Sequence, residues 1–271
     1  MTLTIATWNI NSVRLRLDQV TRLLREQAPD VLCLQEINCM EAHFPGAAFA
    51  DLGYRHIAIA GQKGYHGVAT LSRHPFSSVE RGPFCRNGDA RHIAVGFASG
   101  GLAGITLHNF YVPAGGDEPD PEQNEKFAHK LDFLGELRDW PTALIASGNR
   151  SSIMAGDLNI APLETDVWSH KQLLRVVSHT PIEVDGLNRV QAAGHWTDAV
   201  RRIIAPEEKL YSWWSYRAAD WAAADRGRRL DHIWTGPDLA GRIKDAAVVR
   251  EARGWERPSD HAPVILRLSA P

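Results

Sequence analysis

Hydrophobic residues alternate with polar ones, or run without interruption, over several short segments of the chain. Residues 3–8 (LTIATW) alternate, whereas residues 31–35 (VLCLQ) form a nearly continuous apolar run. Such patterns predict strands that are buried on one or both faces. On the same criteria we expect strands at residues 67–72, 92–98, 105–112, 153–156, 229–235 and 264–268, and these complete the predicted set.

Two other segments have the three- or four-residue apolar spacing of an amphipathic helix. The first covers residues 13–28, is closed by Pro29, and has its apolar positions at Val13, Leu17, Val20, Leu24 and Ala28. The second is outlined by Phe127, Leu131, Leu134 and Leu137. The mixture of strands and helices indicates an α/β protein. Without a Pro/Gly-rich linker or a low-complexity tract, a single domain over residues 1–271 is expected.

Composition and charge narrow the class of protein. A net charge of -2 and a charged fraction of 23% describe an ordinary globular protein, so a phosphate-binding surface has to be local. Three unevenly spaced cysteines are too few for a disulfide framework or a paired-cysteine zinc site, which favours a reducing setting. We see no export signal and no membrane span in the sequence, so a cytoplasmic, unanchored protein is expected.

Polar side chains recur where the predicted strands end. They are Asn9, Glu36, Tyr111, Asp157, Asn159, Asp231, Asp260 and His261. Strand ends gather at one edge of a sheet, so these side chains can converge on one pocket. Carboxylate and amide oxygens suit magnesium or manganese and disfavour zinc. Each residue alone also fits a structural role, in a turn for Asn and Asp or in the core for tyrosine.

Six short motifs contain these residues. They are WNINSVR at 8–14, LQE at 34–36, YVPAGG at 111–116, GDLNIAP at 156–162, RLDHIW at 229–234 and SDHAP at 259–263. Together, in this order and at this spacing, they resemble the exonuclease III family of DNA repair nucleases. The resemblance implies a four-layered α/β sandwich of the DNase I-like type, with two mixed β-sheets face to face and helices outside. Such a fold does not by itself determine the substrate.

The resemblance also implies roles for individual residues. Glu36 is expected to be the main metal ligand, with Asn9 and Asp260 close by and Asn11 at the edge of the site. Magnesium, or manganese in its place, keeps several waters and takes only one or two protein carboxylates.

The remaining motif residues are expected to be catalytic. By resemblance, Asp157, held by Asn159, orients and deprotonates the attacking water, while Tyr111 and His261 donate hydrogen bonds to the phosphate. Asp231 resembles the aspartate that hydrogen-bonds the histidine and favours its charged form. Whether Asp157 or Tyr111 receives the water's proton stays open at this point.

A separate segment has the composition of a DNA-binding surface. Aromatic residues at 211–216 are followed by Arg217 and then by Arg226, Arg228 and Arg229. Aromatic rings stack on bases or sugars, and guanidinium groups bind phosphates. By resemblance, Trp213 and Trp214 flank the pocket for an extruded abasic sugar, and Arg217 and Arg228 contact DNA. Tryptophans are more often core residues, so we expect one of the two to be buried.

Two positions depart from the family pattern. Ala114 stands where relatives carry asparagine or glutamine, which predicts one hydrogen bond fewer at the phosphate or metal. Arg228 stands where some abasic-site endonucleases have tryptophan, which leaves open the balance between endonuclease and exonuclease activity.

The leading hypothesis is a magnesium-dependent, monomeric enzyme acting on double-stranded DNA. It would remove nucleotides in the 3′ to 5′ direction, cut 5′ to abasic sites and clean blocked 3′ ends. One alternative keeps the fold and the metal but changes the substrate to a phosphoinositide, sphingomyelin or RNA. Another is a catalytically inactive homologue that binds nucleic acid or protein.

Overall fold

The strands of the computed structural model, which describes residues 2–82, 84–146 and 150–270, form two six-stranded sheets. The first sheet has the order β13 (Ile243–Val248), β14 (Val264–Ser269), β1 (Thr2–Asn9), β2 (Val31–Gln35), β4 (Val68–Ser72) and β3 (His56–Ala60). The second has the order β5 (Phe76–Glu80), β6 (His92–Phe97), β7 (Thr106–Tyr111), β8 (Ser152–Asp157), β12 (Asp231–Thr235) and β9 (Thr197–Asp198).

Each sheet contains a parallel pair of strands flanked by antiparallel neighbours. In the first sheet β1 and β2 are parallel and are joined through helix α1 (Leu17–Glu26). In the second β7 and β8 are parallel and are joined through helix α3 (Glu125–Ala146). The two halves of the chain therefore repeat one strand–helix–strand unit, a similarity that the residue pattern does not display. Both units bring two strand C-termini to a common edge.

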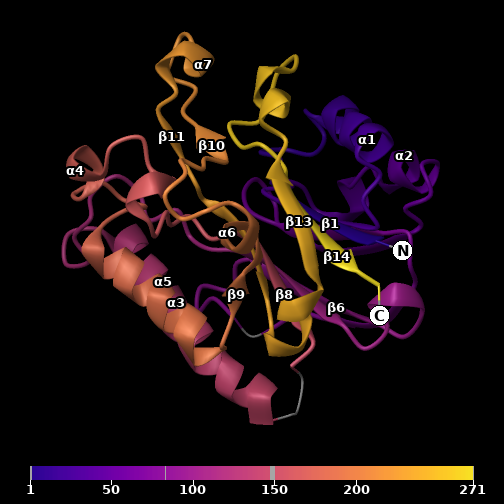
Figure 1. Ribbon diagram of the computed structural model, residues 1–271. Helices are drawn as coiled ribbons and strands as arrows, with labels where there is room; N and C mark the ends of the chain where they lie inside the picture. Colours follow the sequence, from indigo (N-terminus) through magenta and orange to yellow (C-terminus); the bar gives the residue numbers. More distant parts are fainter. Residues whose placement is uncertain (1, 83, 147–149, 271) are drawn as a thin grey trace.

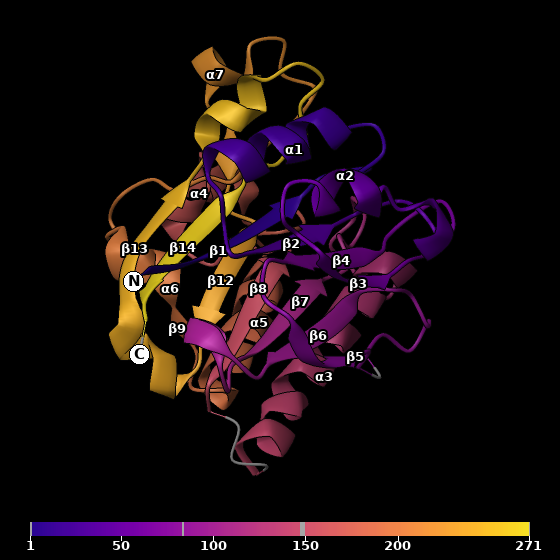
Figure 2. The same ribbon diagram turned by 90° about the vertical axis from the view of Figure 1, so that its right-hand side faces the viewer.

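The two sheets and the helices outside them form four layers (Figure 2). Hydrophobic side chains fill the three spaces between these layers. Residues such as Ile5, Val95 and Ile233 pack between the two sheets. Helices α1 and α2 (Gly46–Ala50) cover the outer face of the first sheet, and α3 and α5 (Pro181–Ala193) cover that of the second. The predicted four-layered α/β sandwich is confirmed.

A buried polar bridge connects the two sheets. The side-chain amide of Gln35, in β2, donates to Asn109 Oδ1, in β7, at 2.8 Å. Asn109 in turn donates to the backbone carbonyls of Leu34 and Ala69 in the first sheet. Because an unpaired amide in this interior would cost free energy, these bonds favour one alignment of the sheets.

The predicted strands are all observed, but the predicted set is incomplete. The sequence patterns missed β3, β5, β9 and β13, each of which lies at an edge of its sheet. An edge strand has one partner and exposes polar residues, as β5 (FSSVE) does, so its apolar pattern is weak. The first helix is also shorter than expected. The backbone N–H groups of Ser12 and Val13 donate to the carbonyls of Glu36 and Ile37 rather than entering the helix.

Short elements complete the described chain. Strands β10 (Trp213–Trp214) and β11 (Gly227–Arg228) form a hairpin that projects with helix α7 (Trp221–Ala224), as Figure 1 shows. Further short helices are α4 (His170–Leu173) and α6 (Ala199–Ile203), and 3-10 turns occupy Glu41–His43, Gly100–Leu102, Glu164–Asp166, Pro237–Arg242 and Arg250–Gly254. Among the described residues, no helix has the length and apolar character that crossing a membrane requires.

Candidate active site

The polar residues at the strand ends converge at one edge of the sandwich. Asn9 ends β1, Glu36 follows β2, and Tyr111 and Asp157 end β7 and β8. These are the carboxyl ends of the two parallel pairs, so the convergence predicted from the sequence follows from the topology.

Three further site residues come from antiparallel strands. Asp231 begins β12 directly opposite Asp157, and Asp260 and His261 precede β14. The site is therefore shared between the sheets. The first sheet contributes Asn9, Glu36, Asp260 and His261, and the second contributes Tyr111, Asp157, Asn159 and Asp231.

A cleft of about 740 Å³ opens above these side chains. The polar residues that line it include Glu36, Asp157, Asn159, Asp260 and His261. Aromatic and basic residues line it as well, namely Trp168, Trp213, Trp214, Tyr216, Trp221, Arg217, Arg226 and Arg228. Asp157, Asn159 and His261 thus line the same cleft as the predicted DNA-binding residues, and Tyr111 and Asp231 lie behind this lining.

Glu36 is held by two donors on a single oxygen. Asn9 Nδ2 and the Tyr111 hydroxyl donate to Glu36 Oε1 at 2.9 and 2.8 Å. Among the described residues these leave Oε2 as the oxygen available to a cation. Burial, together with the charges of Glu36 and Asp157, raises the pKa of Tyr111 well above its usual value. The phenol therefore stays protonated at neutral pH and acts as a donor.

Asp157 lies at the centre of the hydrogen-bond network. Its Oδ2 accepts from Asn9 Nδ2 at 2.9 Å and from Asn159 Nδ2 at 3.0 Å, and its Oδ1 accepts from the Asn159 backbone at 2.9 Å. Burial raises the pKa of Asp157 to about 7, although the neighbouring His261 charge opposes the rise. A carboxylate with this pKa can accept a proton from water at neutral pH.

His261 faces a carboxylate with each ring nitrogen. Its Nδ1 lies 2.8 Å from Asp231 Oδ2, and its Nε2 lies 3.8 Å from Asp157 Oδ2. Burial alone would lower the pKa of His261, but the Asp231 and Asp157 carboxylates outweigh it and raise the pKa to about 10. The imidazole is therefore charged at neutral pH, with an N–H on both nitrogens.

The residues that could hold a metal are Glu36 and Asp260. Both are half-buried and line the cleft. Asp260 accepts from Asn11 Nδ2 at 3.4 Å and from Trp213 Nε1 at 2.9 Å. Asn9 Oδ1 accepts the backbone N–H of Asn11 at 3.1 Å, and its amide NH₂ donates to Glu36 and Asp157, so Asn9 orients both carboxylates. Its expected role as a metal ligand stays a prediction.

The trio Asp157, Asp231 and His261 is also close enough to hold a metal. Its ligand atoms already have hydrogen-bond partners, because His261 Nδ1 lies 2.8 Å from Asp231 Oδ2 and both Asp157 oxygens accept from Asn9 or Asn159. We therefore interpret this trio as a proton-transfer and charge-stabilising group.

Backbone conformations in the left-handed region accompany the site. Asn11, Glu36 and Asn159 have φ of 45°, 48° and 54°. A glutamate in this region is unusual, and such strain is often found at functional sites. Gly156, just before Asp157, has φ of 146°, and a Cβ there would lie 1.9 Å from the Phe110 carbonyl oxygen. Only glycine allows this approach of β8 to β7.

The expected DNA-binding residues differ in exposure. Trp214 is buried, packs against Tyr211 and donates to Asp225 at 3.0 Å, so one of the two tryptophans is buried as expected. Trp213 is half-buried, and the Arg228 guanidinium lies 5.1 Å from its ring centre. Arg217 is exposed at the cleft.

One arginine of this segment has a structural role instead. The sequence pattern grouped Arg229 with the phosphate-binding arginines, but this side chain is buried. It pairs with Asp166 at 2.8 Å and with Asp198 at 2.7 Å. Both carboxylates compensate the charge in the interior, so Arg229 is not available to DNA.

Several residues that position the site were not predicted. Ser212 Oγ donates to Asp231 Oδ2 at 2.7 Å, and Ser259 Oγ donates to the Asn9 carbonyl at 2.7 Å. Buried Lys130 donates to the carbonyls of Ala114 and Asn159 at 3.2 and 2.8 Å, joining two loops of the cleft. A signal for Lys130 exists, because a charged residue three positions after Phe127 falls on the apolar face of the helix.

Comparisons with known proteins agree with this geometry. Residues 6–261 match the Endonuclease/Exonuclease/phosphatase family. Exodeoxyribonuclease III of Haemophilus influenzae is 32% identical over 95% of this chain and 96% of that protein. Among solved structures, the 3′ phosphatase NExo from Neisseria, bound to a product DNA hairpin, is 32% identical with a TM-score of 0.89, covering 98% of this chain and 99% of that one. An AP endonuclease from Archaeoglobus fulgidus is 33% identical with a TM-score of 0.88, covering 97% and 98%. The chain therefore belongs to the Endonuclease/Exonuclease/phosphatase family and is a repair nuclease of the exonuclease III type.

Proposed function

We propose that the protein hydrolyses the bond between phosphorus and the 3′ oxygen in duplex DNA, with magnesium as its cofactor. The observation that carries this proposal is the shared cleft. A carboxylate with a pKa of about 7, a charged histidine and two accessible carboxylates lie at its floor, and aromatic and arginine side chains line it. This combination suits water attack on a phosphodiester flanked by bases and sugars.

The donor set fits a hard divalent cation. Glu36 and Asp260 would hold it, because both are carboxylates at the cleft and each is already oriented by neighbouring donors. The Asn9 amide donates to Glu36 and the Asn11 amide donates to Asp260, so both amides orient the carboxylates. When bound, magnesium supplies positive charge to a phosphate oxygen and to the leaving 3′ oxygen. Manganese prefers the same ligands and serves as a substitute.

Asp157 is the proposed general base. It takes one proton from the attacking water as the oxygen bonds to phosphorus and the bond to the 3′ oxygen breaks. The products are a 5′ phosphate and a 3′ oxygen that takes up one proton from solvent to become a hydroxyl, and Asp157 returns its proton to solvent. Tyr111 stays protonated, which favours Asp157 over Tyr111 as the proton acceptor. Asn159 keeps Asp157 in place through two hydrogen bonds.

The charged His261 is proposed to donate from Nε2 to a non-bridging oxygen of the phosphate. Asp231 holds the opposite nitrogen and keeps the ring charged. A fixed cation in a buried site stabilises the developing negative charge without reorganisation of solvent. The Tyr111 hydroxyl donates its one hydrogen to Glu36 in this structure, so it would have to turn from Glu36 to become a second donor to the phosphate.

The proposed substrates are duplex DNA with an abasic site and duplex DNA with a free or blocked 3′ end. Trp213 would stack on an extruded sugar or base, while Arg217 and Arg228 would contact phosphates. The relatives named as an AP endonuclease, a 3′ phosphatase and an exodeoxyribonuclease support this range. We also propose that the protein acts as a monomer in the cytoplasm.

Two departures from the family pattern bear on which of these activities dominates. The Ala114 side chain is exposed at the cleft and has no polar atom to offer a phosphate. Arg228 donates to the Val177 carbonyl at 3.0 Å and to Ser178 Oγ at 2.8 Å, which holds it against Trp213. We propose that Arg228 makes this wall of the cleft more basic than a tryptophan would.

The proposal is tested with an end-labelled duplex that carries one central abasic site, incubated with magnesium or with a chelator. A magnesium-dependent cut 5′ to the lesion shows endonuclease activity, and shortening from the 3′ end shows exonuclease activity. A second duplex with a 3′ phosphate tests removal of a blocked end. If all substrates stay intact, the protein is not a DNA hydrolase. Release of phosphate from a lipid or from RNA alone would favour the alternative substrates.

A further inference from the structure

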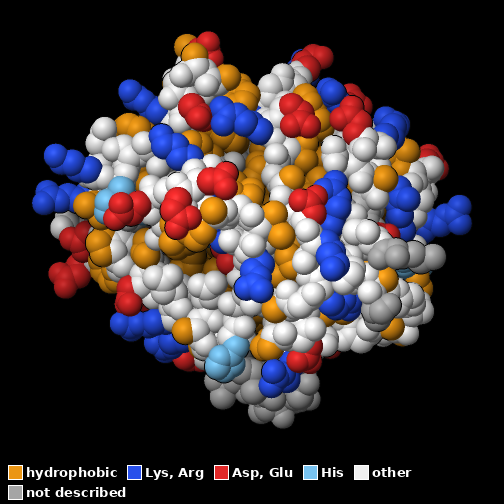
Figure 3. All heavy atoms as spheres, viewed as in Figure 1, with side chains coloured by type: hydrophobic (Ala, Val, Ile, Leu, Met, Phe, Trp, Pro, Cys, Tyr) orange, Lys and Arg blue, Asp and Glu red, His pale blue; other side chains and the backbone are white. Residues whose placement is uncertain are grey.

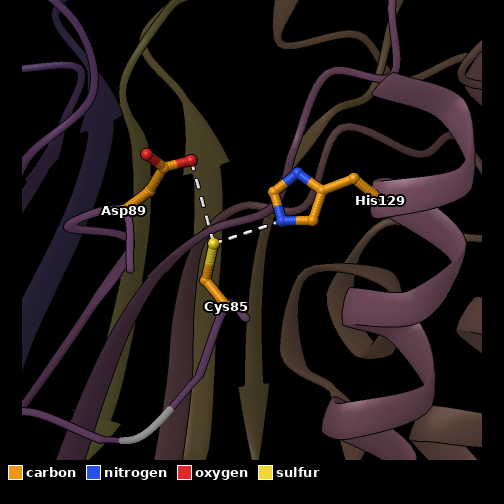
Figure 4. Close-up of side chains that lie close together, drawn as sticks. All are labelled: Cys85, Asp89 and His129. Atoms are coloured by element: carbon orange, nitrogen blue, oxygen red, sulfur yellow. Dashed lines mark hydrogen bonds between the residues drawn. The ribbon is translucent and has the colours of Figure 1, made fainter. Parts of the chain in front are cut away.

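A second cluster of metal-ligating side chains lies outside the catalytic cleft. Cys85 and Asp89 belong to the loop between β5 and β6, and His129 projects from α3 (Figure 4). Cys85 Sγ lies 3.2 Å from His129 Nε2 and 3.8 Å from Asp89 Oδ2. One potential ligand atom of each residue lies within 4.8 Å of the others. The catalytic cluster has no sulfur, so the two sites differ in chemistry.

We propose that Cys85, Asp89 and His129 form a site for a thiophilic divalent metal, with zinc as the best match. A thiolate, an imidazole and one carboxylate are the ligands that zinc takes in tetrahedral sites. With Zn–S of about 2.3 Å and Zn–N of about 2.0 Å, tetrahedral geometry places sulfur and nitrogen about 3.5 Å apart. Cys85 Sγ lies 3.2 Å from His129 Nε2 and 3.8 Å from Asp89 Oδ2, and these distances lie on either side of that value.

The surroundings fix each ligand in place. The Cys85 backbone N–H donates to Glu136 Oε2 at 2.7 Å, and Gln62 donates to Asp89 Oδ1 at 3.0 Å. Asp89 Oδ2 faces the sulfur and also accepts from Arg91 Nε at 3.2 Å. The Asn87 side-chain amide lies 3.3 Å from His129 Nδ1. If His129 Nε2 binds a metal, Nδ1 carries the ring proton. The Nδ1–H group can then donate a hydrogen bond to Asn87 Oδ1, once the Asn87 amide turns its oxygen towards the ring.

The orientation of His129 suits metal binding. Its Nε2 faces Cys85 Sγ at 3.2 Å while its Nδ1 faces the Asn87 amide at 3.3 Å, so Nε2 is the ring nitrogen turned towards the cluster. On binding, the Cys85 thiol loses one proton to solvent as the sulfur–metal bond forms.

The local charge also favours a dication. A Cys85 thiolate, Asp89 and Glu136 contribute three negative charges, and Arg91, which pairs with Asp89 at 3.2 Å, contributes one positive charge. The remaining charge of about −2 matches a divalent cation. A cavity of about 350 Å³ reaches Cys85 and Asp89, so an ion can enter and a water can complete the coordination. The φ of 74° at Cys85 is a further sign of a constrained position.

Such a metal would connect the segment between β5 and β6, which contains Cys85 and Asp89, to helix α3, which contains His129. Helix α3 belongs to the layer that covers the second sheet. The chain has three cysteines, all free, and this one pairs with a histidine rather than with another cysteine. That explains why cysteine spacing gave no sign of a metal site.

Cobalt(II) is the probe for the first test, because a thiolate ligand gives a sulfur-to-cobalt absorption band that oxygen ligands cannot give. The full-length protein is titrated with cobalt in excess magnesium, which occupies oxygen-rich sites. We expect this band and tetrahedral cobalt bands to saturate at one equivalent and to disappear on adding zinc. Absence of a thiolate band in the wild-type protein overturns the proposal.

Matched variants locate the site. Cys85→Ser should remove the thiolate band, and His129→Asn should weaken cobalt binding at least tenfold. Cys39→Ser, which changes another buried cysteine outside the cluster, should leave the titration unchanged. Loss of the band in Cys39→Ser, or its retention in Cys85→Ser, would place the metal elsewhere and refute the assignment.

A second measurement separates binding from folding. Zinc at a hundredfold excess over its dissociation constant should raise the thermal midpoint of the wild-type protein by roughly 5 °C. Cys85→Ser and the wild type should unfold at similar temperatures in chelator, and only the wild type should respond to zinc. An equal response of both proteins would contradict the proposal. Nuclease activity does not enter either readout, so the result is independent of the proposed function.

Discussion

The two ends of the cleft are constructed differently. At the hydrolytic end, the catalytic residues sit at the ends of strands and are held by several hydrogen bonds each, as Asp157 is by Asn9 and Asn159. At the recognition end, side chains sit on the short β10–β11 hairpin and on loops, and Arg217 is exposed. In Figure 3 hydrophobic side chains lie between the two upper projections, with acidic and basic side chains scattered around them.

The difference shows how the fold divides its tasks. Strand ends in a packed sandwich are rigid, so they can keep catalytic groups at fixed distances. Exposed residues of this segment, such as Tyr216 and Arg217, can vary without disturbing the sheets, whereas Trp214 is buried and its backbone N–H donates to the Asp260 carbonyl at 2.9 Å. Chemistry is thus tied to the core, and substrate choice to the projection. Four predictions test this division, from the largest expected effect to the smallest.

Replacing the proposed base should have the largest effect. Asp157→Asn keeps the shape and most hydrogen bonds but cannot take a proton, so kcat should fall on the order of 10³-fold or more. Single-turnover cleavage of abasic duplex measures the effect. Binding of the same duplex and the thermal midpoint should stay close to wild type. A loss of less than tenfold in kcat would show that another group accepts the proton.

Removing the partner of the histidine should have an intermediate effect. In Asp231→Asn the ring loses a carboxylate that keeps it charged, so transition-state stabilisation weakens and kcat should fall about 10²-fold. KM should change little. Asp245→Asn, in the edge strand β13, is the matched control and should be as active as wild type. Equal activity of both variants would argue against a charged His261 in the reaction.

Trp213 tests the separation of the hydrolytic end from the recognition end most directly, because it contacts both ends of the cleft. Its ring faces the cleft and its Nε1 donates to Asp260. Trp213→Ala should raise KM for abasic duplex roughly tenfold through lost stacking. Trp213→Phe keeps a ring but loses the hydrogen bond. If it resembles wild type in KM but needs more magnesium, Trp213 serves both ends; if the magnesium requirement is unchanged, its role is recognition alone.

The smallest effect is expected at the exposed arginine. Arg217→Ala should weaken DNA binding only a few-fold, and the slope of log affinity against log salt should become shallower by about one. Arg138→Ala, on the outer helix α3, should leave the slope unchanged. Binding isotherms at several salt concentrations measure it. An unchanged slope in Arg217→Ala would mean that this side chain does not reach a phosphate.

Sequence patterns predicted the buried central strands better than the edge strands and the contacts between distant segments. Buried strands such as β2 carry strong apolar runs, and the motif residues at their ends came together as expected. Edge strands β3 and β13 were missed, since exposure on one side dilutes the pattern. Arg229 was misassigned because spacing along a chain does not reveal that Asp166, 63 positions away, pairs with it. Contacts between distant segments are set by tertiary packing, which no local pattern contains.

The catalytic residues are divided between the two sheets, so the complete site requires both sheets to be folded and packed together. Asn9 Nδ2, at the end of β1, donates to Asp157 Oδ2, at the end of β8, across 148 positions of the chain, and Gln35 donates to Asn109 across the interior. Each sheet carries only half of the catalytic set, so neither half can cut a strand by itself. A chain that is incompletely synthesised, or whose cleaved fragments have separated, therefore lacks a complete active site and should not cleave DNA. For an enzyme whose substrate is DNA, this requirement for a finished fold is a safeguard against stray cleavage.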